Sequence, residues 1–232
     1  MSGAGAPDFF YREAQRLGYV ARSAFKRAAA SDAEAIQTHQ TRFFHSRPWL
    51  CSWCLASGSL SELGPIKKWW CSCGHRPQEQ KVKVPSLHCD ARVRTVCADV
   101  MNLPKCQVKA LSPQQLGFSV ILSDMCPLVS GITTKDAALS AELGMRALDL
   151  AVGGTAILDD IIQRERQSDG SDSSPDDRGV LKRGGHLIIK FLESEDVQEF
   201  SRICKPLFRK ASWLRPKATR SSSREIYLIC QV

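Results

Sequence analysis

The chain has 232 residues, of which 43% are hydrophobic, 24% charged and 7% aromatic. That is enough for one domain with a buried core and too little for two large ones, and the composition excludes collagen, coiled coil and wholesale disorder. The formal net charge of +8 favours a polyanionic partner such as nucleic acid, although a charge of this size can also serve solubility alone.

The sequence contains no run of about 18 apolar residues, so we expect no membrane span and no membrane partner. Residues 1–7 lack the basic flank and apolar stretch of a secretory signal. Ten cysteines without such a signal favour reduced thiols, metal ligands or buried cysteines over a disulfide framework. We therefore expect an intracellular monomer, in a mitochondrial, cytoplasmic or nucleolar setting that the sequence does not distinguish.

In chain order, residues 8–26 form a basic, helix-prone segment with aromatic anchors, and strands and helices alternate from Arg92 onward. This alternation predicts an α/β fold, an open sheet with helices on both faces. A Ser- and Asp-rich stretch at about 163–182 predicts a disordered loop. The expected strands cover 94–98, 118–123, 185–191 and 224–231, and the expected helices cover 136–152 and 195–209.

Residues 27–80 do not fit this pattern, because they show neither helical nor strand periodicity. The segment holds four of the five tryptophans, four of the ten cysteines and three of the five histidines. We therefore treat 27–80 as aberrant, between the N-terminal helix of 8–26 and the remainder of the domain at 84–232. All three belong to one expected domain that covers 1–232.

Five ordered segments resemble the FtsJ family of S-adenosylmethionine-dependent RNA ribose 2′-O-methyltransferases. Their order and spacing match the family across most of 8–26 and 84–232, so the resemblance is specific. It implies a Rossmann-like methyltransferase sheet and a ribosomal RNA substrate. The segments are GYVARSAFK (18–26), ADV (98–100), SDMCPLVSGITTKDA (123–137), GGHLIIKF (184–191) and RPKATRSSSREIYLIC (215–230).

The resemblance places the family's catalytic tetrad on Lys26, Asp124, Lys190 and Glu225. Asp124 and Lys190 also end apolar segments, and open α/β sheets bind ligands where their strands end. Desolvation at a strand end favours a neutral amine, which can accept a proton from a ribose 2′-hydroxyl. The family then implies Lys190 as the base, with the other three residues orienting the reactants.

Each of these residues also has an ordinary structural interpretation. A lysine at a strand end can be a solvated terminus, and Asp124 can cap the following turn. Glu225 can be a surface charge paired with Arg224. The appearance of all four residues in the family's order favours the catalytic interpretation.

The resemblance implies S-adenosylmethionine as cofactor, with Asp99 near its adenine and Asp124 also lining the cofactor site. A strand-end cap is the alternative role for Asp99. The family's glycine-rich loop, D-L-G-x-x-P-G-x-W, should follow soon after Lys26, but 27–80 contains nothing like it. We therefore expect the first two strands of the sheet to be lost and this chain to be inactive.

We interpret 27–80 as translated one base out of frame. Tryptophan has a single codon, TGG, so reading one base later at Trp49 and Trp53 forces glycines four residues apart. With suitable codons, residues 45–59 then read I-L-D-L-G-C-A-P-G-A-W-L-Q-V, which is the missing loop. Trp69 and Trp70 likewise force Gly-Gly.

A zinc site is the competing interpretation of this segment. Cys51, Cys54, Cys71, Cys73 and His75 could supply four soft ligands to Zn²⁺. The second pair has C-x-C rather than C-x-x-C spacing, which weakens the match. Shifted Trp and Cys codons explain the cluster without a metal, so we assign no metal.

We expect basic residues at both ends of the chain to grip RNA phosphates beside the cleft, with ribosomal RNA, free or within a subunit, as the partner. Scattered solvated charge is the alternative. The resulting prediction is methylation of a ribose 2′-hydroxyl in large-subunit ribosomal RNA; the second hypothesis is a catalytically silent or zinc-binding RNA-binding protein. The residues expected to contact RNA are Arg12, Arg16, Arg22, Lys217 and Arg220.

Overall fold

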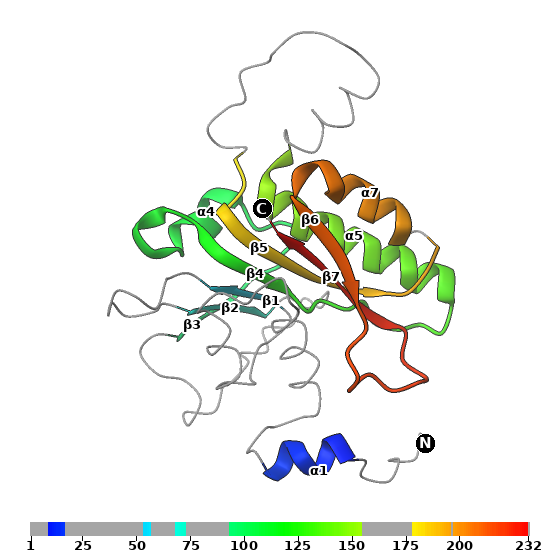
Figure 1. Cartoon of the computed structure of the whole chain (residues 1–232). Coiled ribbons are helices and arrows are strands. Elements are labelled where there is room, and N and C mark those ends of the chain that lie inside the picture. The colour runs from blue at the N-terminus through cyan, green and yellow to red at the C-terminus, as the bar shows by residue number, and fades with distance from the viewer. Residues whose placement is uncertain are drawn as a thin grey trace, which may run out of the picture.

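Within the part of the chain that the structure describes, seven strands make one mixed sheet in the order β3-β2-β1-β4-β5-β7-β6, shown in Figure 1. The computed structural model describes residues 9–16, 53–56, 68–72, 93–154, 178–195 and 197–231. The strands are β1 (Trp53–Ala56), β2 (Lys68–Ser72), β3 (Val93–Cys97), β4 (Phe118–Ser123), β5 (Leu181–Leu192), β6 (Lys210–Leu214) and β7 (Glu225–Gln231). The helices are α1 (Phe9–Arg16), α4 (Lys105–Ala110), α5 (Thr133–Val152) and α7 (Val197–Leu207), with a 3-10 turn at Pro113–Gln115.

The centre of the sheet follows from its apolar strands. β4 and β5 run parallel, and β7 is antiparallel to β5. Residues rich in Ile, Leu and Val are buried along all three, as expected for strands covered on both faces. The predicted strands at 94–98, 118–123, 185–191 and 224–231 are confirmed within a few residues. β6 and α4 were not predicted from the sequence.

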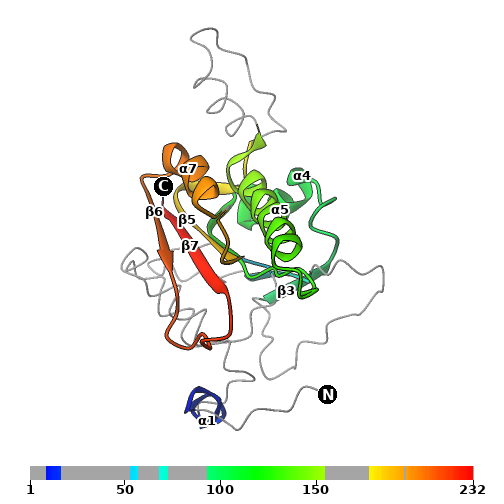
Figure 2. The ribbon, with the colours of Figure 1, turned by 90° about the vertical axis from the view of Figure 1, so that its right-hand side faces the viewer.

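Helices α4, α5 and α7 lie on the same side of the sheet, while α1 lies on the other side (Figures 1 and 2). The arrangement follows from chain direction, because successive right-handed crossovers that advance the same way across a sheet leave their helices on one face. The predicted helices at 136–152 and 195–209 are confirmed.

α5 packs directly against β5 at Gly144, which faces the ring of Phe191 so closely that a Cβ atom would overlap the ring. Phe191 is itself buried and makes edge contacts with Phe200 and Trp213. Around them a continuous apolar core joins β4, β5, β7, α5 and α7. This core fixes the central strands, and with them the residues at their ends.

The expected loss of the first two strands is corrected by the structure. β1 and β2 occupy the places between β3 and β4, but β1 runs antiparallel to both of its neighbours. Their sequences, WCLA and KWWCS, contain residues that an extended backbone accommodates. Strand pairing uses backbone groups, and an unpaired edge of β4 would leave those groups unsatisfied.

The last residues of the range 163–182, which was expected to be a disordered loop, are ordered in the structure. Val180 is buried, and Phe118 donates a backbone hydrogen bond to its carbonyl. β5 already begins at Leu181, four residues before the predicted strand. The apolar side chains at 180 and 181 explain the difference, because they join the core. Residues 155–177 lie outside the described part of the chain.

No helix in the described residues is long and apolar enough to cross a membrane. The four cysteines whose side chains are described, Cys106, Cys126, Cys204 and Cys230, are free thiols. This agrees with the expectation of reduced cysteines for that part of the chain. The described residues hold no group of three or more potential metal ligands, and the suggested zinc ligands lie outside the described side chains.

Candidate active site

Polar side chains converge at the edge of the sheet where β4 and β5 end and β7 begins. Asp124 directly follows β4, and Ser123 pairs with Ile189 of β5, so the next residues on the two strands, Asp124 and Lys190, come level. β7 is antiparallel, so its first residue, Glu225, starts at this same edge opposite Leu192. The fold thus brings together three residues that are far apart in the sequence.

Lys190 and Asp124 form a largely buried ion pair. The Lys190 Nζ atom lies 3.1 Å from Asp124 Oδ1, and the two side chains are 9% and 14% exposed. Burial of this kind strengthens the attraction between the charges but also removes them from water, so each charge depends on the other. The pair is the chemical centre of the site.

Tyr227 adds a neutral donor to this pair. Its hydroxyl donates a hydrogen bond of 3.0 Å to Asp124 Oδ1, the same oxygen that contacts Lys190. Tyr227 stands directly opposite Lys190 in the β5–β7 ladder, and Glu225 is two residues earlier on the same face because strand side chains alternate. Lys190 and Tyr227, which both contact the Asp124 carboxylate, therefore come from directly paired positions on β5 and β7.

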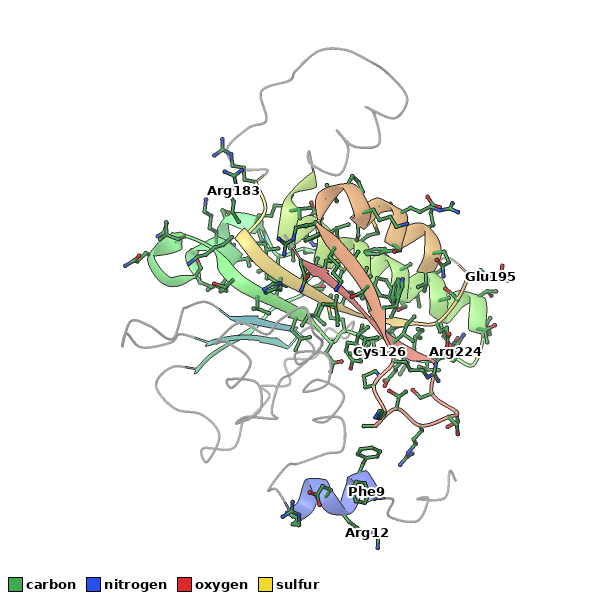
Figure 3. The ribbon with its side chains drawn as sticks, viewed as in Figure 1. Phe9, Arg12, Cys126, Arg183, Glu195 and Arg224 are labelled. Atoms are coloured by element: carbon green, nitrogen blue, oxygen red, sulfur yellow. The ribbon has the colours of Figure 1, made fainter. Side chains whose placement is uncertain are left out.

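Cys126 lies close enough to the charged groups of the site for them to affect the pKa of its thiol. Burial raises the pKa of its thiol, and the negative charges of Glu225 and Asp124 raise it further while Lys190 opposes them. Figure 3 shows Cys126 and Arg224 together at this edge, whereas Arg183 lies at the other end of β5. Glu225 thus belongs to the same electrostatic group as the ion pair.

The loop after Asp124 is anchored by a buried carboxylate at the start of α5. Asp136 accepts hydrogen bonds from the Ser130 amide (2.8 Å), the Ser130 hydroxyl (2.7 Å) and the Gly131 amide (3.3 Å). These bonds hold the pKa of Asp136 below its ordinary value. The loop between Asp124 and α5 also leaves three large apolar side chains exposed, those of Leu128, Val129 and Ile132.

Hydrogen bonds also fix the ends of the two strands that carry Lys190 and Glu225. Leu192 donates its amide to the buried Ser140 hydroxyl of α5 (3.0 Å), and Glu193 donates its amide to the Arg224 carbonyl (2.7 Å). Arg215 contacts the Glu193 carboxylate and donates to the Ser223 carbonyl. The β6–β7 loop is thereby tied to the edge of the site.

Asp99 follows β3, which ends at the same edge as β4 but is separated from it in the sheet by β2 and β1. Its carboxylate accepts hydrogen bonds from the Met101 amide (3.0 Å) and from the Asn102 side chain (2.7 Å). The structural role suggested for Asp99, a cap on the turn after the strand, is therefore present. The exposed position leaves room for a ligand as well.

Two predicted site residues, Lys26 and Arg22, lie outside the described residues. Among the RNA candidates, Arg12 is exposed on α1, and in Figure 3 it faces away from the sheet. Arg16 is paired with Glu13 through two contacts, which offsets its charge. Lys217 and Arg220 are exposed in the β6–β7 loop, next to the site.

The model of the family described as FtsJ-like methyltransferase matches residues 19–232. The chain belongs to the FtsJ-like methyltransferase family. Members methylate ribose 2′-hydroxyl groups of RNA, and the family implies S-adenosylmethionine as methyl donor. The predicted family and fold class are confirmed.

Two relatives of this FtsJ-like chain align over nearly all of it, and a third aligns over little more than half. The ribosomal RNA large subunit methyltransferase E of Desulfosudis oleivorans is 25% identical over 98% of this chain and 91% of that protein. The tRNA (cytidine(32)/guanosine(34)-2′-O)-methyltransferase of Schizosaccharomyces pombe is 23% identical over 97% and 69%. The methyltransferase E of Anaplasma marginale is 32% identical over 58% of this chain and 53% of that protein.

Among solved structures, a protein described as a ribosomal RNA methyltransferase from Plasmodium falciparum aligns with a TM-score of 0.41 and 17% identity. The alignment covers 62% of this chain and 65% of that one.

The residues of this FtsJ-like chain fit only half of a cofactor site. In an open α/β sheet a nucleotide cofactor lies outside the carboxyl ends of the strands, where the strand order reverses direction; here that point lies between β1 and β4. β4 ends there with Asp124, but β1 begins there, because Trp53 pairs with Ser123 and Ala56 with Val120. The loop after β1 leaves from the opposite edge, so the described strands do not fit the family's cofactor.

Tyr227 and Asp136 were not predicted as parts of the site, although both lie in segments that resemble the family, 215–230 and 123–137. Tyr227 is two residues after Glu225 in a strand, and alternation alone could have placed the two on one face. Asp136 carried no comparable signal, since an acidic residue in the first turn of a helix is common on dipole grounds.

Proposed function

We propose that the site of this FtsJ-like methyltransferase activates a ribose 2′-hydroxyl of large-subunit ribosomal RNA, with Lys190 as general base. The observation that carries the proposal is the buried contact between Lys190 Nζ and Asp124 Oδ1 at the edge where the strands end. Such an edge is where open α/β sheets bind their ligands.

In this proposal the proton of the 2′-hydroxyl passes to Lys190 Nζ, and the ribose oxygen becomes the nucleophile. The amine must be neutral when it accepts the proton, and the adjacent Asp124 carboxylate then stabilises the ammonium ion that forms. A general base of this kind contributes about 10²–10⁴-fold to a rate. Because Asp124 is held by Tyr227 and Lys190 by its strand, little motion is needed to place the base.

Glu225 and Lys26 complete the proposed set. Glu225 begins β7 beside the ion pair, where its carboxylate can accept a hydrogen bond from a ribose hydroxyl. The role of Lys26 rests on the family motif alone, since it lies outside the described residues. Its expected task is to orient the 2′-oxygen.

Large-subunit ribosomal RNA is the proposed substrate because relatives aligned along nearly the whole chain carry that name. The tRNA methyltransferase of fission yeast matches a similar share of this chain but is itself longer. Recognition of RNA within a ribosomal subunit by a monomer, and the intracellular compartment, belong to the same proposal.

The exposed basic residues Lys217 and Arg220 are proposed to contact the RNA backbone beside the ion pair. Each lost contact to single-stranded RNA should lower the slope of log affinity against log salt by about 0.7. The test compares the chain with a Lys217→Gln/Arg220→Gln variant by fluorescence anisotropy at several salt concentrations. Arg183→Gln, at the far end of β5, is the control, and equal slopes for all three proteins would contradict the assignment.

The proposed RNA contacts of α1, Arg12 and Arg16, are tested in the same way. Neutralising Arg12 and Arg16 should weaken RNA binding at low salt, with Arg12 contributing more because Arg16 is already paired with Glu13. Unchanged binding by Arg12→Gln would remove α1 from the RNA-binding surface.

The catalytic proposal is tested on a frame-restored chain, in which the segment between Lys26 and Gln80 is read one base later. We expect it to methylate a large-subunit rRNA transcript, detected as transfer of a radioactive methyl group and as resistance of the modified linkage to alkali. Lys190→Met should lower the rate about 10²–10⁴-fold, while Lys182→Met, on the same strand, should not. Full activity of Lys190→Met would contradict the role of Lys190 as base.

A further inference from the structure

We infer that this chain lacks the cofactor half of its active site because residues 27–80 are read one base out of frame, and that the other reading frame of the same DNA encodes it. The inference rests on the proposed function, because it concerns the same site. It predicts that the printed chain keeps the half of the site made by Asp124, Lys190 and Glu225 and does not bind S-adenosylmethionine.

The direction of one strand, β1, supports this inference. β2 and β3 run parallel to each other, as do β4 and β5; because β1 is antiparallel to β2 and to β4, all four of these strands end at one edge. Among the five strands from β3 to β5 in the sheet order, β1 alone runs the other way. It lies at the point where the strand order reverses, which is where the loops after two neighbouring strands must enclose a cofactor.

The reversed strand leaves only one side of that crevice. The residue after β4 is Asp124, but the neighbouring position at the same edge is Trp53, the first residue of β1. No turn follows β1 at this edge, so no run of backbone amides from such a turn can face a bound cofactor. The structural observation is independent of the codon argument.

The sequence shows the same defect. Between Lys26 and Gln80 there are three glycines, at 58, 64 and 74, and none is within five residues of another. A loop whose backbone approaches a nucleotide closely needs clustered glycines, because a side chain would occupy the space of the ligand.

One base later, the DNA of this segment must encode such a cluster. TGG is the sole tryptophan codon, and both leucine and cysteine codons begin with T or C. Trp49-Leu50 and Trp53-Cys54 therefore each give GGT or GGC, which encode glycine. The two glycines are four residues apart, and Trp53 is the residue that now begins the reversed strand.

The other half of the site does not depend on this segment. Asp124, Lys190, Glu225 and Tyr227 all come from β4, β5 and β7, and the core beneath them is made from the same strands with α5 and α7. A chain in which 27–80 is read out of frame can therefore retain the Lys190–Asp124 ion pair and the β6–β7 loop that is proposed to contact RNA. The result is a catalytic edge without a place for the methyl donor.

The test has two parts, and the first is the coding DNA. We expect it to give the glycine-rich loop when 27–80 is read one base later, with the frame restored between Gln80 and Lys83. Codons that give no D-L-G-x-x-P-G-x-W-like sequence, or a transcript with no compensating shift, overturn the inference without any protein being made.

The second part measures cofactor binding by calorimetry, with S-adenosylmethionine and S-adenosylhomocysteine as probes. The full printed chain is compared with the frame-restored chain, and circular dichroism confirms that each is folded. We expect binding at least about 100-fold tighter for the frame-restored chain, equivalent to two or three backbone hydrogen bonds. A frame-restored chain with valine in place of the glycine read from the Trp49 codon should lose this gain.

Micromolar binding by the printed chain overturns the inference, and so does a folded frame-restored chain that does not bind either probe. If the frame-restored chain does not fold, the coding DNA decides. A frame-restored chain that binds the cofactor but does not methylate RNA supports this inference and contradicts the proposed function, so the two failures are distinguishable.

Discussion

Tyr227 and Asp124 are joined by a hydrogen bond of 3.0 Å between the phenol and the carboxylate oxygen that also contacts Lys190. Asp124 Oδ1 thus accepts a hydrogen bond from the neutral Tyr227 hydroxyl and also contacts the Lys190 ammonium group. The donor, Tyr227, lies on β7, and the acceptor, Asp124, directly follows β4. The bond therefore holds the Asp124 carboxylate from a strand other than the one that carries it. We regard Tyr227 as a positioning residue for the Lys190–Asp124 pair.

Replacing Tyr227 with Phe should test this role with little change in shape. A hydrogen bond to a charged acceptor is worth about 1.5–3 kcal/mol, so we expect urea unfolding of the full chain to show a loss in that range. In an Asp124→Asn background the same substitution should cost clearly less. Equal costs in the two backgrounds would mean that the phenol does not act through Asp124.

The ion pair itself predicts a non-additive result. Asp124→Asn leaves the Lys190 ammonium buried without its anion, and breaking a buried pair in this way costs about 3–5 kcal/mol. The double variant Asp124→Asn/Lys190→Met removes both charges and should be more stable than Asp124→Asn alone. Urea unfolding checks this, and additive losses would show that the two charges do not interact in solution.

Much of the fold could be predicted because its central strands are apolar and end at polar residues. The segment 118–123 was predicted to the residue, and the next polar residue, Asp124, proved to lie against Lys190. Here local patterning and family order pointed the same way. The short edge strand β6 carried no such pattern, since its side chains are half-buried.

The reversed direction of β1 could not be predicted, because strand direction depends on chain connections and backbone pairing rather than on the side chains of four residues. Asp136 was missed for a related reason. Its role depends on amide groups of Ser130 and Gly131, and backbone donors leave no signal in a sequence. Both gaps concern interactions made by the main chain.

Asp136 gives a prediction for pH dependence. Its hydrogen bonds with Ser130 and Gly131 lower its pKa in the folded chain below the ordinary value of 3.8. The stability it contributes is therefore complete above about pH 4 and is lost as the pH falls from 3.8 through the folded pKa. Asp136→Asn should lower the urea midpoint at pH 7, and the gap to the parent chain should shrink below pH 4.

Glu142→Gln is the control for that experiment, because Glu142 is exposed on the same helix. It should leave the midpoint close to that of the parent chain at neutral pH. A gap between the parent chain and Asp136→Asn that stays constant from pH 7 to pH 3 would contradict the lowered pKa of Asp136 as its cause.

Replacing Gly144 with alanine should change the free energy of unfolding through two effects of opposite sign. Alanine in the middle of α5 would gain about 1 kcal/mol of helix propensity, but its Cβ would overlap the Phe191 ring. That ring is only 2% exposed and has centroid contacts of 4.6 Å with Phe200 and 5.6 Å with Trp213, so it has no room to move. We expect the overlap to dominate, with a net loss of about 1–3 kcal/mol in urea unfolding.

A second substitution separates the two effects at Gly144. Phe191→Leu removes the opposing ring, so Gly144→Ala should be neutral or stabilising in that background. Ala138→Gly, at an exposed position of the same helix, should cost about 1 kcal/mol from propensity alone. If Gly144→Ala instead stabilises the parent chain, α5 does not lie as close to β5 as the structure has it, and the support that α5 gives to the end of β5 through Ser140 loses its basis.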